Sequence, residues 1–264
     1  MSIKRQLLKS RLIRNTNYTR IANQQYLNNK DLVKRLQALK DSHKGERCFI
    51  IGTGPSLTIQ DLELLQGEVT FATNRIYELF PKTTWRPTYY VNQDHELIKT
   101  FGDNIRDIDV ERIFLPVDYA QRFPGEKYSF FVLKHKEFFP QDAPFSTDIS
   151  RYLAQGFTVT YGAIQIAAYM GFKEMYLLGI DHNYSISRDA KGRPVKQESI
   201  AKNYPDGMKE IVNQKNLPRV EETTVAYETA EKISRQLGFR IYNATRGGKL
   251  ESFERVQLEA VLER

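Results

Sequence analysis

Cysteine is almost absent from this chain, since Cys48 is the only one among 264 residues. A single thiol excludes an intramolecular disulfide and a cysteine-based zinc site, and it suits a reducing compartment. Histidine is scarce as well, with four residues, which argues against a histidine-rich metal cluster. No apolar segment follows the first charges in the manner of a secretory signal, so we expect a cytoplasmic protein.

Long apolar runs are also missing. The longest stretch without a charged residue is 152–172, and glutamine, glycine and threonine interrupt it. A membrane-spanning helix needs about 20 predominantly apolar residues. This stretch therefore predicts a strand, a loop and a helix of a folded domain.

Positive charge is concentrated at the N-terminal end of the chain. Residues 1–44 hold 11 Lys/Arg and 2 Asp/Glu, a balance of +9, so the remainder of this chain of net charge +7 has a balance of −2. The near-neutral body argues against a nucleic-acid partner, because a nucleic-acid-binding surface would spread lysine and arginine over the folded domain.

Residues 3–14 and 30–40 place leucine, isoleucine and valine at helical spacing among lysine and arginine, which predicts a basic helical arm. Two interpretations stay open. The arm packs on the body or on a neighbouring subunit of a homo-oligomer, with its charges in water. Alternatively, it attaches the protein to an anionic membrane, the inner face of the cytoplasmic membrane, where each cation contributes about 1 kcal/mol.

From residue 47 on, apolar runs typical of strands alternate with segments of helical spacing. The predicted strands are residues 48–51, 69–73, 87–91, 112–117, 128–133, 157–162, 174–180 and 239–245, and the predicted helices are 58–65, 163–171 and 223–238. This alternation predicts an α/β fold with a Rossmann-like, mostly parallel sheet and helices on both faces. We expect the basic arm, 1–44, and a nucleotide-binding catalytic domain, 45–264, in which 186–220 forms a lid-like insertion.

In an open parallel sheet, the ligand binds beyond the carboxyl ends of the strands. Gly-Thr-Gly-Pro-Ser at 52–56 follows the first strand and precedes a helix, where backbone N–H groups and the helix N-terminus would be available to a phosphate. The segment lacks the third glycine of a dinucleotide fingerprint and the lysine of a P-loop. A structural tight turn with Ser56 as the helix N-cap is the alternative. Asn74 and Asn92 end two further strands, and together with the glycine loop they favour a nucleotide site.

Four titratable side chains lie at predicted strand ends: Asp94, His95, Asp181 and His182. A transferase that deprotonates an acceptor hydroxyl needs a base with a pKa near the working pH. We predict that His182 is this base, because the neighbouring Asp181 would raise its pKa. The pair His95 and Asp94 is the second choice, and we expect Asp181 in a structural or sugar-binding role. A purely structural role stays open for each histidine.

Five motifs, in this order, carry a resemblance to a known family: CFIIGTGPSL, TFATNRIY, PTYYVNQDHEL, TVTYGAIQIAAYMGFKEMYLLGIDHNYS and IYNATRGGKLESF. They resemble the 6-hydroxymethylpterin diphosphokinase-like family of bacterial polysaccharide-locus proteins, a former domain of unknown function. Members of that family also occur within motility-associated flagellin glycosyltransferases. The same motifs are similar to bacterial CMP-sialic-acid sialyltransferases. The resemblance covers residues 46–264, with a poor match over 186–220.

The resemblance implies a pocket for a nucleotide diphosphate or CMP. Thr160 and Tyr161 match a polar pair of the sialyltransferases that contacts sugar or phosphate, and Gly179 and Asp181 match their loop under the nucleotide. Two departures concern catalysis: no histidine follows His182, where the sialyltransferases have their catalytic one, and Tyr184 only partly matches their phosphate-binding tyrosines. The candidate nucleotide-binding residues are Gly52, Thr53, Gly54, Pro55, Ser56, Asn74, Asn92, Thr160, Tyr161, Gly179 and Tyr184.

Three functions stay open. The first is a metal-independent glycosyltransferase of bacterial surface-polysaccharide or glycoconjugate synthesis, which transfers a sugar without a cofactor. Its donor would be a nucleotide sugar, CMP-linked in the favoured version, and its acceptor a saccharide or a lipid-linked saccharide. The second is a pterin diphosphokinase that uses ATP and Mg²⁺, with Asp94 and Asp181 as metal ligands. The third is a non-catalytic assembly protein. The basic arm favours the first, because it would bring the enzyme to a membrane that holds lipid-linked acceptors.

Overall fold

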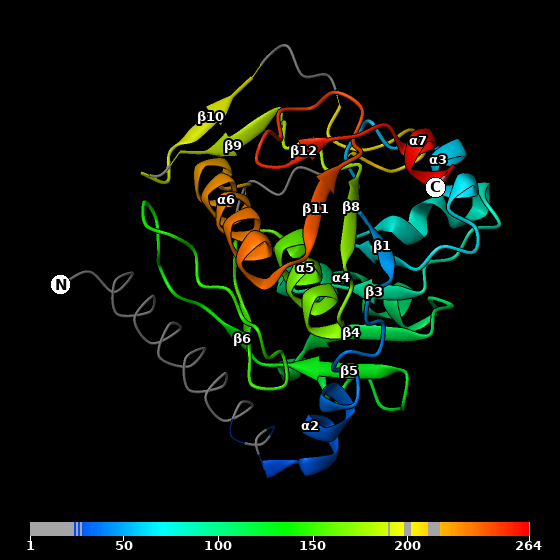
Figure 1. The fold of residues 1–264 in the computed structure, drawn as a ribbon, viewed down its shortest axis with the longest axis vertical. Coiled ribbons are helices and arrows are strands. Elements are labelled where there is room, and N and C mark those ends of the chain that lie inside the picture. The colour runs from blue at the N-terminus through cyan, green and yellow to red at the C-terminus, as the bar shows by residue number, and fades with distance from the viewer. Residues whose placement is uncertain are drawn as a thin grey trace.

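The computed structural model describes residues 24, 26, 28–189, 191–197, 202–210 and 217–263. Its largest sheet has eight strands in the order β12-β11-β8-β1-β2-β3-β4-β5, and every neighbouring pair is parallel (Figure 1). The strands are β1 (Arg47–Ile51), β2 (Thr70–Thr73), β3 (Tyr89–Val91), β4 (Arg112–Pro116), β5 (Tyr128–Phe131), β8 (Glu174–Leu178), β11 (Arg240–Asn243) and β12 (Glu254–Arg255). The predicted α/β fold with a parallel sheet is confirmed.

The direction in which the chain adds strands reverses at β1. Strands β2 to β5 are added on one side of β1, and β8, β11 and β12 are added on the other. The two central strands end level with each other, since Ile51 pairs with Leu178. The loops that follow β1 and β8 therefore meet at the carboxyl edge of the sheet. This is its topological switch point, where open α/β sheets bind ligands.

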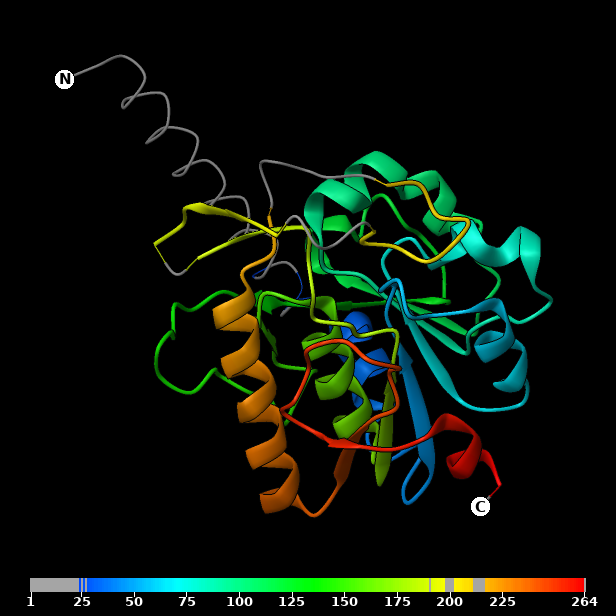
Figure 2. The ribbon, with the colours of Figure 1, turned by 90° about the horizontal axis from the view of Figure 1, so that it is seen from above.

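Right-handed crossovers in two opposite directions place helices on both faces of the sheet. Helices α5 (Val159–Met170) and α6 (Val220–Leu237) lie on one side, and α3 (Ile59–Leu64) and α4 (His95–Arg106) lie on the other (Figure 2). Because both faces are covered, the side chains of residues 48–51 in β1 are apolar throughout and fully buried. Helix α4 lies where we predicted no helix. The other helical segments in the described part of the chain are α2 (Lys30–Gln37), α7 (Leu258–Leu262) and the 3-10 helices η1 (Ile76–Lys82) and η2 (Val117–Tyr119).

One predicted strand is wrong. Residues 159–162, predicted as the end of a strand, form the first turn of α5, and Thr158 caps this helix by accepting a hydrogen bond from Thr160 N (3.3 Å). Valine, threonine and tyrosine favour strands by local propensity. Nearly all of α5 is buried, however, so tertiary packing decides its conformation.

Two element boundaries also differ from the prediction. The predicted strand 128–133 divides into β5 and β6 (Leu133–Lys134), which pairs with β7 (Leu153–Ala154) in a separate two-stranded sheet. The predicted helix 223–238 begins three residues earlier and ends as expected at Gly238, whose φ is +77°. Glycine adopts this left-handed conformation without the steric cost that a Cβ brings.

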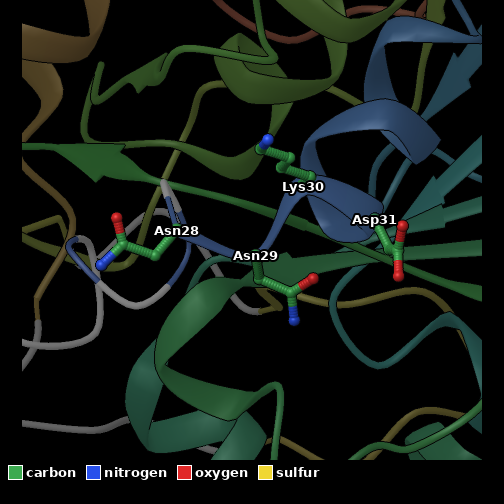
Figure 3. Close-up of a pocket in the computed structure, with 4 residues that line it drawn as sticks. All are labelled: Asn28, Asn29, Lys30 and Asp31. Carbon is green, nitrogen blue, oxygen red and sulfur yellow. The ribbon is translucent and has the colours of Figure 1, made fainter.

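The predicted N-terminal arm falls partly within the described residues. Its first helix, 3–14, lies outside them, whereas the second, 30–40, is confirmed as α2, whose Leu36 is buried. A hollow of about 520 Å³ at the start of α2 lies near the edge strand β5, and so away from the switch point. It is lined by Asn28, Asn29, Lys30 and Asp31 (Figure 3).

The predicted insertion at 186–220 begins with an antiparallel hairpin of β9 (Ile186–Arg188) and β10 (Pro194–Lys196). The hairpin lies over the N-terminal end of α6 (Figure 1), where Arg188 N donates a hydrogen bond to Pro218 O (2.7 Å). Its role as a lid stays a prediction. None of the helices in the described part of the chain combines the length and the apolar character that crossing a bilayer requires.

Candidate active site at the carboxyl edge of the sheet

The two loops at the switch point pack directly against each other. Gly52 N donates to Leu178 O and Gly54 N donates to Gly179 O, each at 2.8 Å. A Cβ on Gly54 would overlap the Asp181 carboxylate and would lie 2.7 Å from Gly179 O. Glycine is therefore required here for the packing of the two loops, and a larger residue would disturb the protein itself as well as a ligand.

Asp181 is bound to the glycine loop through Ser56. Ser56 Oγ donates to Asp181 Oδ2 (2.8 Å), and Ser56 N lies 3.4 Å from the same oxygen. Burial raises the pKa of Asp181, and the hydrogen bonds from Ser56 counteract this rise. The alternative that Ser56 is a helix N-cap is wrong, since Thr58 caps α3 in a capping box with Asp61.

Few donors of the glycine loop remain for a phosphate. The N–H groups of Gly52, Gly54 and Ser56 are directed to oxygens of β8 and of the loop that follows it, and Pro55 has no N–H. Our prediction that the backbone of this loop is available to a phosphate is thus wrong for these groups. Thr53 makes no hydrogen bond with the described residues, so it is the member of the loop left to contact a ligand.

The two predicted asparagines tie the ends of β2 and β3 together. Tyr90 OH donates to Asn74 O (2.6 Å) and accepts from Asn92 Nδ2 (2.9 Å). Asn92 Oδ1 accepts from Asp94 N (2.8 Å). Asn74 has a φ of +54°, a conformation that asparagine tolerates better than most residues. Both asparagines therefore have structural roles at the edge, beside which ligand contact stays a prediction.

Asp94 and His95, the second-choice catalytic pair, belong to the start of α4. Asp94 Oδ1 accepts from two backbone N–H groups of the first turn (2.8 and 3.2 Å), so Asp94 is the helix N-cap. His95 Nδ1 lies 3.0 Å from Tyr119 OH. Burial lowers the pKa of His95, and the negative charge of Asp118 counteracts this shift. Both side chains of the pair are engaged by the protein's own groups.

His182 differs from His95 in burial, and one of its ring nitrogens is a buried atom without a partner among the described residues. The ring is 7% exposed, and its Nε2 lies 2.7 Å from Thr224 Oγ1. The Thr224 hydroxyl lies 2.9 Å from Val220 O, and when it donates there, the proton between the two residues belongs to His182 Nε2. His182 Nδ1 then carries a lone pair, and this buried atom has no hydrogen-bond partner among the described residues.

The pKa of His182 is shifted in the direction opposite to our prediction. Burial lowers it to about 4, whereas we expected the neighbouring carboxylate to raise it. The reason is that Asp181 turns toward Ser56, so it does not pair with the imidazole. At neutral pH the ring is uncharged, and Nδ1 can accept a proton.

The start of α5 is linked to His182 through Tyr227. The two rings meet edge to face at 5.6 Å between centroids, and Tyr227 OH lies 3.4 Å from Thr158 Oγ1. Thr160 is almost fully buried in this first turn. Tyr161 is not in the site, because its buried hydroxyl donates to Pro144 O (2.9 Å), and burial raises its pKa. The positive end of the α5 dipole faces the carboxyl edge.

Tyr184, a candidate phosphate ligand, packs edge to face with His182 at 6.3 Å between ring centroids. Burial raises the pKa of its hydroxyl, with a smaller contribution from the negative charge of Asp181. The structure therefore brings Tyr184 and His182 together, as the loop position of both predicted. The His182 ring contacts Thr224 of α6, whereas the neighbouring Asp181 carboxylate contacts Ser56 of the glycine loop.

Positive charge at the carboxyl edge is limited to a few side chains. The loop after β11 holds Arg246, which pairs with Asp61, and Lys249, whose Nζ donates to Gln197 Oε1 (3.1 Å). Arg75 is the only lysine or arginine in residues 52–56, 74–75, 92–95, 158–161 and 179–184. It is 2% exposed, pairs with Glu78 Oε1 (2.7 Å) and donates to Lys209 O (2.8 Å).

Among the described residues, no three histidine, cysteine, aspartate or glutamate side chains gather in a group that could hold a metal ion.

Residues 202–210 of the insertion connect the loops after β8 and β2. Asn203 Oδ1 accepts from Ser185 N (2.9 Å) on the β8 side. On the β2 side, the Arg75 guanidinium lies 4.5 Å from the centre of the Tyr204 ring. This segment, the strap, therefore crosses the edge of the sheet where the candidate residues lie.

The family model for 6-hydroxymethylpterin diphosphokinase MptE-like proteins matches residues 23–187. The chain belongs to this family. The match includes β1 to β8 and ends before α6. Among curated proteins, no match to the sequence was found.

Two solved structures resemble this MptE-like chain. The MAf glycosyltransferase from Magnetospirillum magneticum AMB-1 is 15% identical, with a TM-score of 0.52 over 84% of this chain and 35% of its own. The sialyltransferase CstII from Campylobacter jejuni, in complex with cytidine-5′-monophosphate, is 14% identical, with a TM-score of 0.44 over 81% of this chain and 85% of its own. This chain thus spans about a third of the MAf protein, and that likeness shows the fold alone.

Sequence reasoning missed three residues of the site in this MptE-like chain: Gln93, Thr224 and Tyr227. Gln93 Nε2 donates to Thr158 O (2.8 Å), and its buried Oε1 has no hydrogen-bond partner among the described residues. Its position beside Asn92 at a strand end was an available signal. Thr224 and Tyr227 lie on a helix outside the family match, and their contact with His182 arises from the packing of α6.

Proposed function

We propose that this protein is a glycosyltransferase that moves a sugar from a nucleotide donor to an acceptor hydroxyl, with His182 as the general base. The observation that carries the proposal concerns His182 Nδ1, which holds a lone pair in the tautomer with a proton on Nε2. It is buried at the switch point of the sheet, and the described residues offer it no hydrogen-bond donor. The fold likeness to the MAf glycosyltransferase agrees with this class of enzyme.

The reaction uses this lone pair directly. The acceptor oxygen attacks the anomeric carbon, the bond between that carbon and the nucleotide phosphate breaks, and the acceptor proton moves to His182 Nδ1. Thr224 holds the opposite nitrogen, so the ring keeps one tautomer and one orientation during the transfer. Positioning of this kind and general-base catalysis together lower the barrier.

Donor binding would raise the pKa of His182. A general base works best with a pKa near the working pH, and about 4 is below that range. A nucleotide phosphate bound at the same edge brings a negative charge, which raises the pKa of a nearby imidazole. We therefore expect His182 to reach its working range when the donor is bound.

The charges at the edge favour a donor with one phosphate. Arg75 is ion-paired with Glu78 and Arg246 with Asp61, so Lys249, the positive end of the α5 dipole and neutral side chains are left to stabilise a phosphate. One negative charge suits such a site better than the two phosphates of a nucleoside diphosphate. We propose a CMP-linked sugar as the donor and a reaction without a metal or other cofactor.

A pterin diphosphokinase, the activity in the family's name, would need carboxylates for Mg²⁺. The two carboxylates that we considered for this role are already engaged, Asp94 as the N-cap of α4 and Asp181 with Ser56. The glycosyltransferase is therefore the better-supported function. Its acceptor would be a saccharide or lipid-linked saccharide of bacterial surface-polysaccharide synthesis, reached in the cytoplasm when residues 1–44 attach the enzyme to the anionic membrane surface.

Thermal-shift measurements with CMP, UDP, GDP and ATP, each with and without Mg²⁺, test the nucleotide. A ligand at 100 times its Kd stabilises the folded state by about 2.7 kcal/mol, so the preferred nucleotide is easily distinguished. We expect CMP to give the largest shift and Mg²⁺ to make little difference. Stabilisation by ATP only with Mg²⁺ would establish the diphosphokinase instead, and the absence of any shift would favour a non-catalytic assembly protein.

A further inference from the structure

The loop between β11 and β12 holds the turn that carries His182. Thr245 Oγ1 accepts from Ile180 N (3.1 Å), and Lys249 N donates to Asp181 O (2.7 Å). Gly248, with a φ of +73°, packs so closely that a Cβ would lie 2.6 Å from Asp181 O. Residues 245–251, here called the clamp loop, therefore grip the backbone on the N-terminal side of His182.

His182 needs such support because its backbone is strained. Its φ is +51°, in the left-handed region that residues with a Cβ rarely adopt. A conformation of this kind persists only when the surrounding structure holds it in place. The contacts of the clamp loop with residues 180–181 and the Thr224 contact of the ring lie on the two sides of this strained residue.

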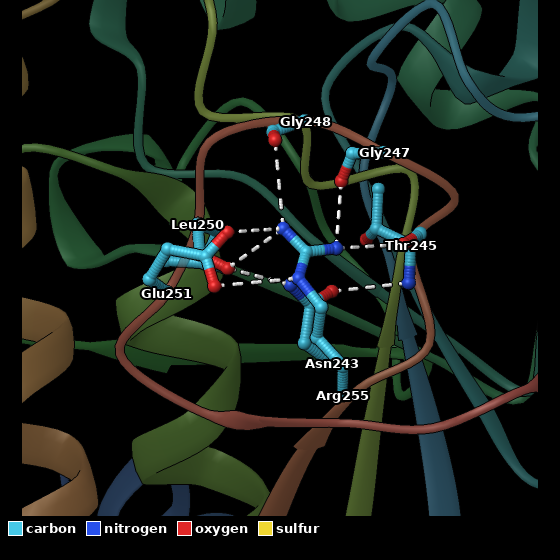
Figure 4. A network of polar contacts seen from close by, with 7 residues as sticks. All are labelled: Asn243, Thr245, Gly247, Gly248, Leu250, Glu251 and Arg255. Carbon is cyan, nitrogen blue, oxygen red and sulfur yellow. Dashed lines mark hydrogen bonds and ion pairs between the residues drawn. The ribbon is translucent and has the colours of Figure 1, made fainter.

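Arg255 in turn holds the clamp loop together (Figure 4). Its guanidinium donates to four carbonyl oxygens of the loop and to Glu251 Oε1 (2.7 Å). The carbonyl oxygens belong to Thr245 (3.3 Å), Gly247 (2.7 Å), Gly248 (3.5 Å) and Leu250 (3.3 Å). A planar fork of five N–H donors can reach this many acceptors when one N–H of Nη2 is shared between two of them, whereas a lysine ammonium has three donors on one atom.

We propose that Arg255 is a positioning residue for the transfer reaction: by fixing the clamp loop, it holds the Asp181–His182 peptide in the conformation that presents His182 Nδ1 to the acceptor. Within the described part of the chain, no hydrogen bond joins Arg255 to His182, and the effect of Arg255 passes through the contacts of Thr245, Gly248 and Lys249. The inference rests on the proposed role of His182 as the base.

The test compares Arg255→Lys with Arg240→Lys. Arg255→Lys keeps the positive charge and a partner for Glu251, but it loses most of the carbonyl contacts. Arg240 is a matched control, because it lies at the start of the neighbouring strand β11, away from the clamp loop, and pairs with Glu254 of β12 (3.3 Å). Full-length protein labelled with ¹⁵N at histidine is used, and the melting temperature of each variant confirms that it is folded.

We expect the ¹⁵N signals of His182 to report a proton on Nε2 in the wild type and in Arg240→Lys, and a mixture of the two tautomers in Arg255→Lys. With a CMP-sugar as donor, kcat of Arg255→Lys should fall roughly 10- to 100-fold while donor affinity changes little, since a small misplacement of a reacting group costs this much. If Arg255→Lys does not fold, Glu251→Gln, which removes only the ionic partner of Arg255, should shift the same signals by a smaller amount.

Unchanged His182 signals in folded Arg255→Lys would overturn the positioning role, whatever the function of His182. A different result would contradict the proposed function, namely a His182→Asn variant with the turnover of the wild type. In that case the altered ring signals of Arg255→Lys would show a structural effect without a catalytic purpose, and the positioning role would be overturned with the base.

Discussion

The same dipeptide, Asp-His, follows two parallel strands of this sheet, and the two copies end in different states. After β3, Asp94 caps α4 and His95 lies half-buried beside Tyr119 OH. After β8, Asp181 accepts from Ser56, and His182 is buried with Nδ1 unpaired. The comparison teaches that an Asp-His pair at a strand end is not by itself a catalytic pair.

The difference comes from the neighbours of each pair. A helix begins at His95, the second residue of the first pair, so the Asp94 carboxylate turns to the free N–H groups of its first turn. No helix begins after the second pair, and the glycine loop opposite offers Asp181 a hydroxyl and an amide in place of an imidazole. His182 is thereby left without a carboxylate, and burial alone sets its pKa.

Replacing each histidine in turn should give the largest contrast. His182→Asn should lower turnover with the preferred donor by about 100-fold or more, the usual contribution of a general base. Asparagine suits the left-handed backbone at this position, so the fold should survive. His95→Asn, the matched control, should keep near-wild-type turnover. Equal losses in the two variants would contradict the distinction drawn between the two turns.

The pH dependence of stability should separate the two histidines next. Between pH 6.5 and about 4, an unfolded chain protonates His182 while the folded protein does not. The free energy of unfolding should therefore fall as the pH drops through this window, by about 3 kcal/mol in total. Above pH 6.5 the folded protein should keep the whole of this contribution to its stability. Urea unfolding of the wild type, His182→Asn and His95→Asn at pH 7 and pH 4.5 measures it.

In His182→Asn most of this pH dependence should disappear. In His95→Asn a larger part should remain, because His95 is less buried and Asp118 counteracts the lowering of its pKa. A wild-type stability that stays constant across the window would show that His182 titrates normally in the folded protein.

Removing the hydroxyl partner of each ring should have a smaller effect. Thr224→Val leaves the buried His182 Nε2–H without an acceptor, which should cost about 1–3 kcal/mol of stability. Turnover should also fall, because the tautomer is no longer fixed. Tyr119→Phe makes the equivalent change beside the more exposed His95, where water can replace the lost partner. Denaturant midpoints and turnover of both variants give the comparison, and an unaffected Thr224→Val would rule out the orienting role of Thr224.

The smallest effect should come from the helix cap. Asp94→Ala removes the N-cap of α4 and should cost about 1 kcal/mol, while Asp94→Ser, another N-cap residue, should restore most of it. Nucleotide binding, measured by thermal shift, should be the same in both variants. Loss of Mg²⁺-dependent ATP binding in Asp94→Ser would instead identify Asp94 as a metal ligand and would favour the diphosphokinase function.

Much of the fold could be predicted from local patterns. The apolar runs at β1 and β8 are continuous because both faces of the sheet are covered, and this continuity marks central parallel strands. The start of α5 could not be predicted, since its strand-favouring residues are helical only through burial between the sheet and α6. The glycine loop was recognised, but its N–H groups proved to be directed to the protein's own oxygens.

The sequence by itself determined the alternation of strands and helices, the parallel sheet, and most of the residues that reach its carboxyl edge. These follow from apolar periodicity and strand-end polarity, which are local properties. The tertiary structure decided which atom at that edge remains unpaired. The partners that settle it are far away in the chain: Ser56 is 125 residues from Asp181, and Thr224 is 42 residues from His182. Such hydrogen bonds depend on which elements pack together, and no local pattern specifies that.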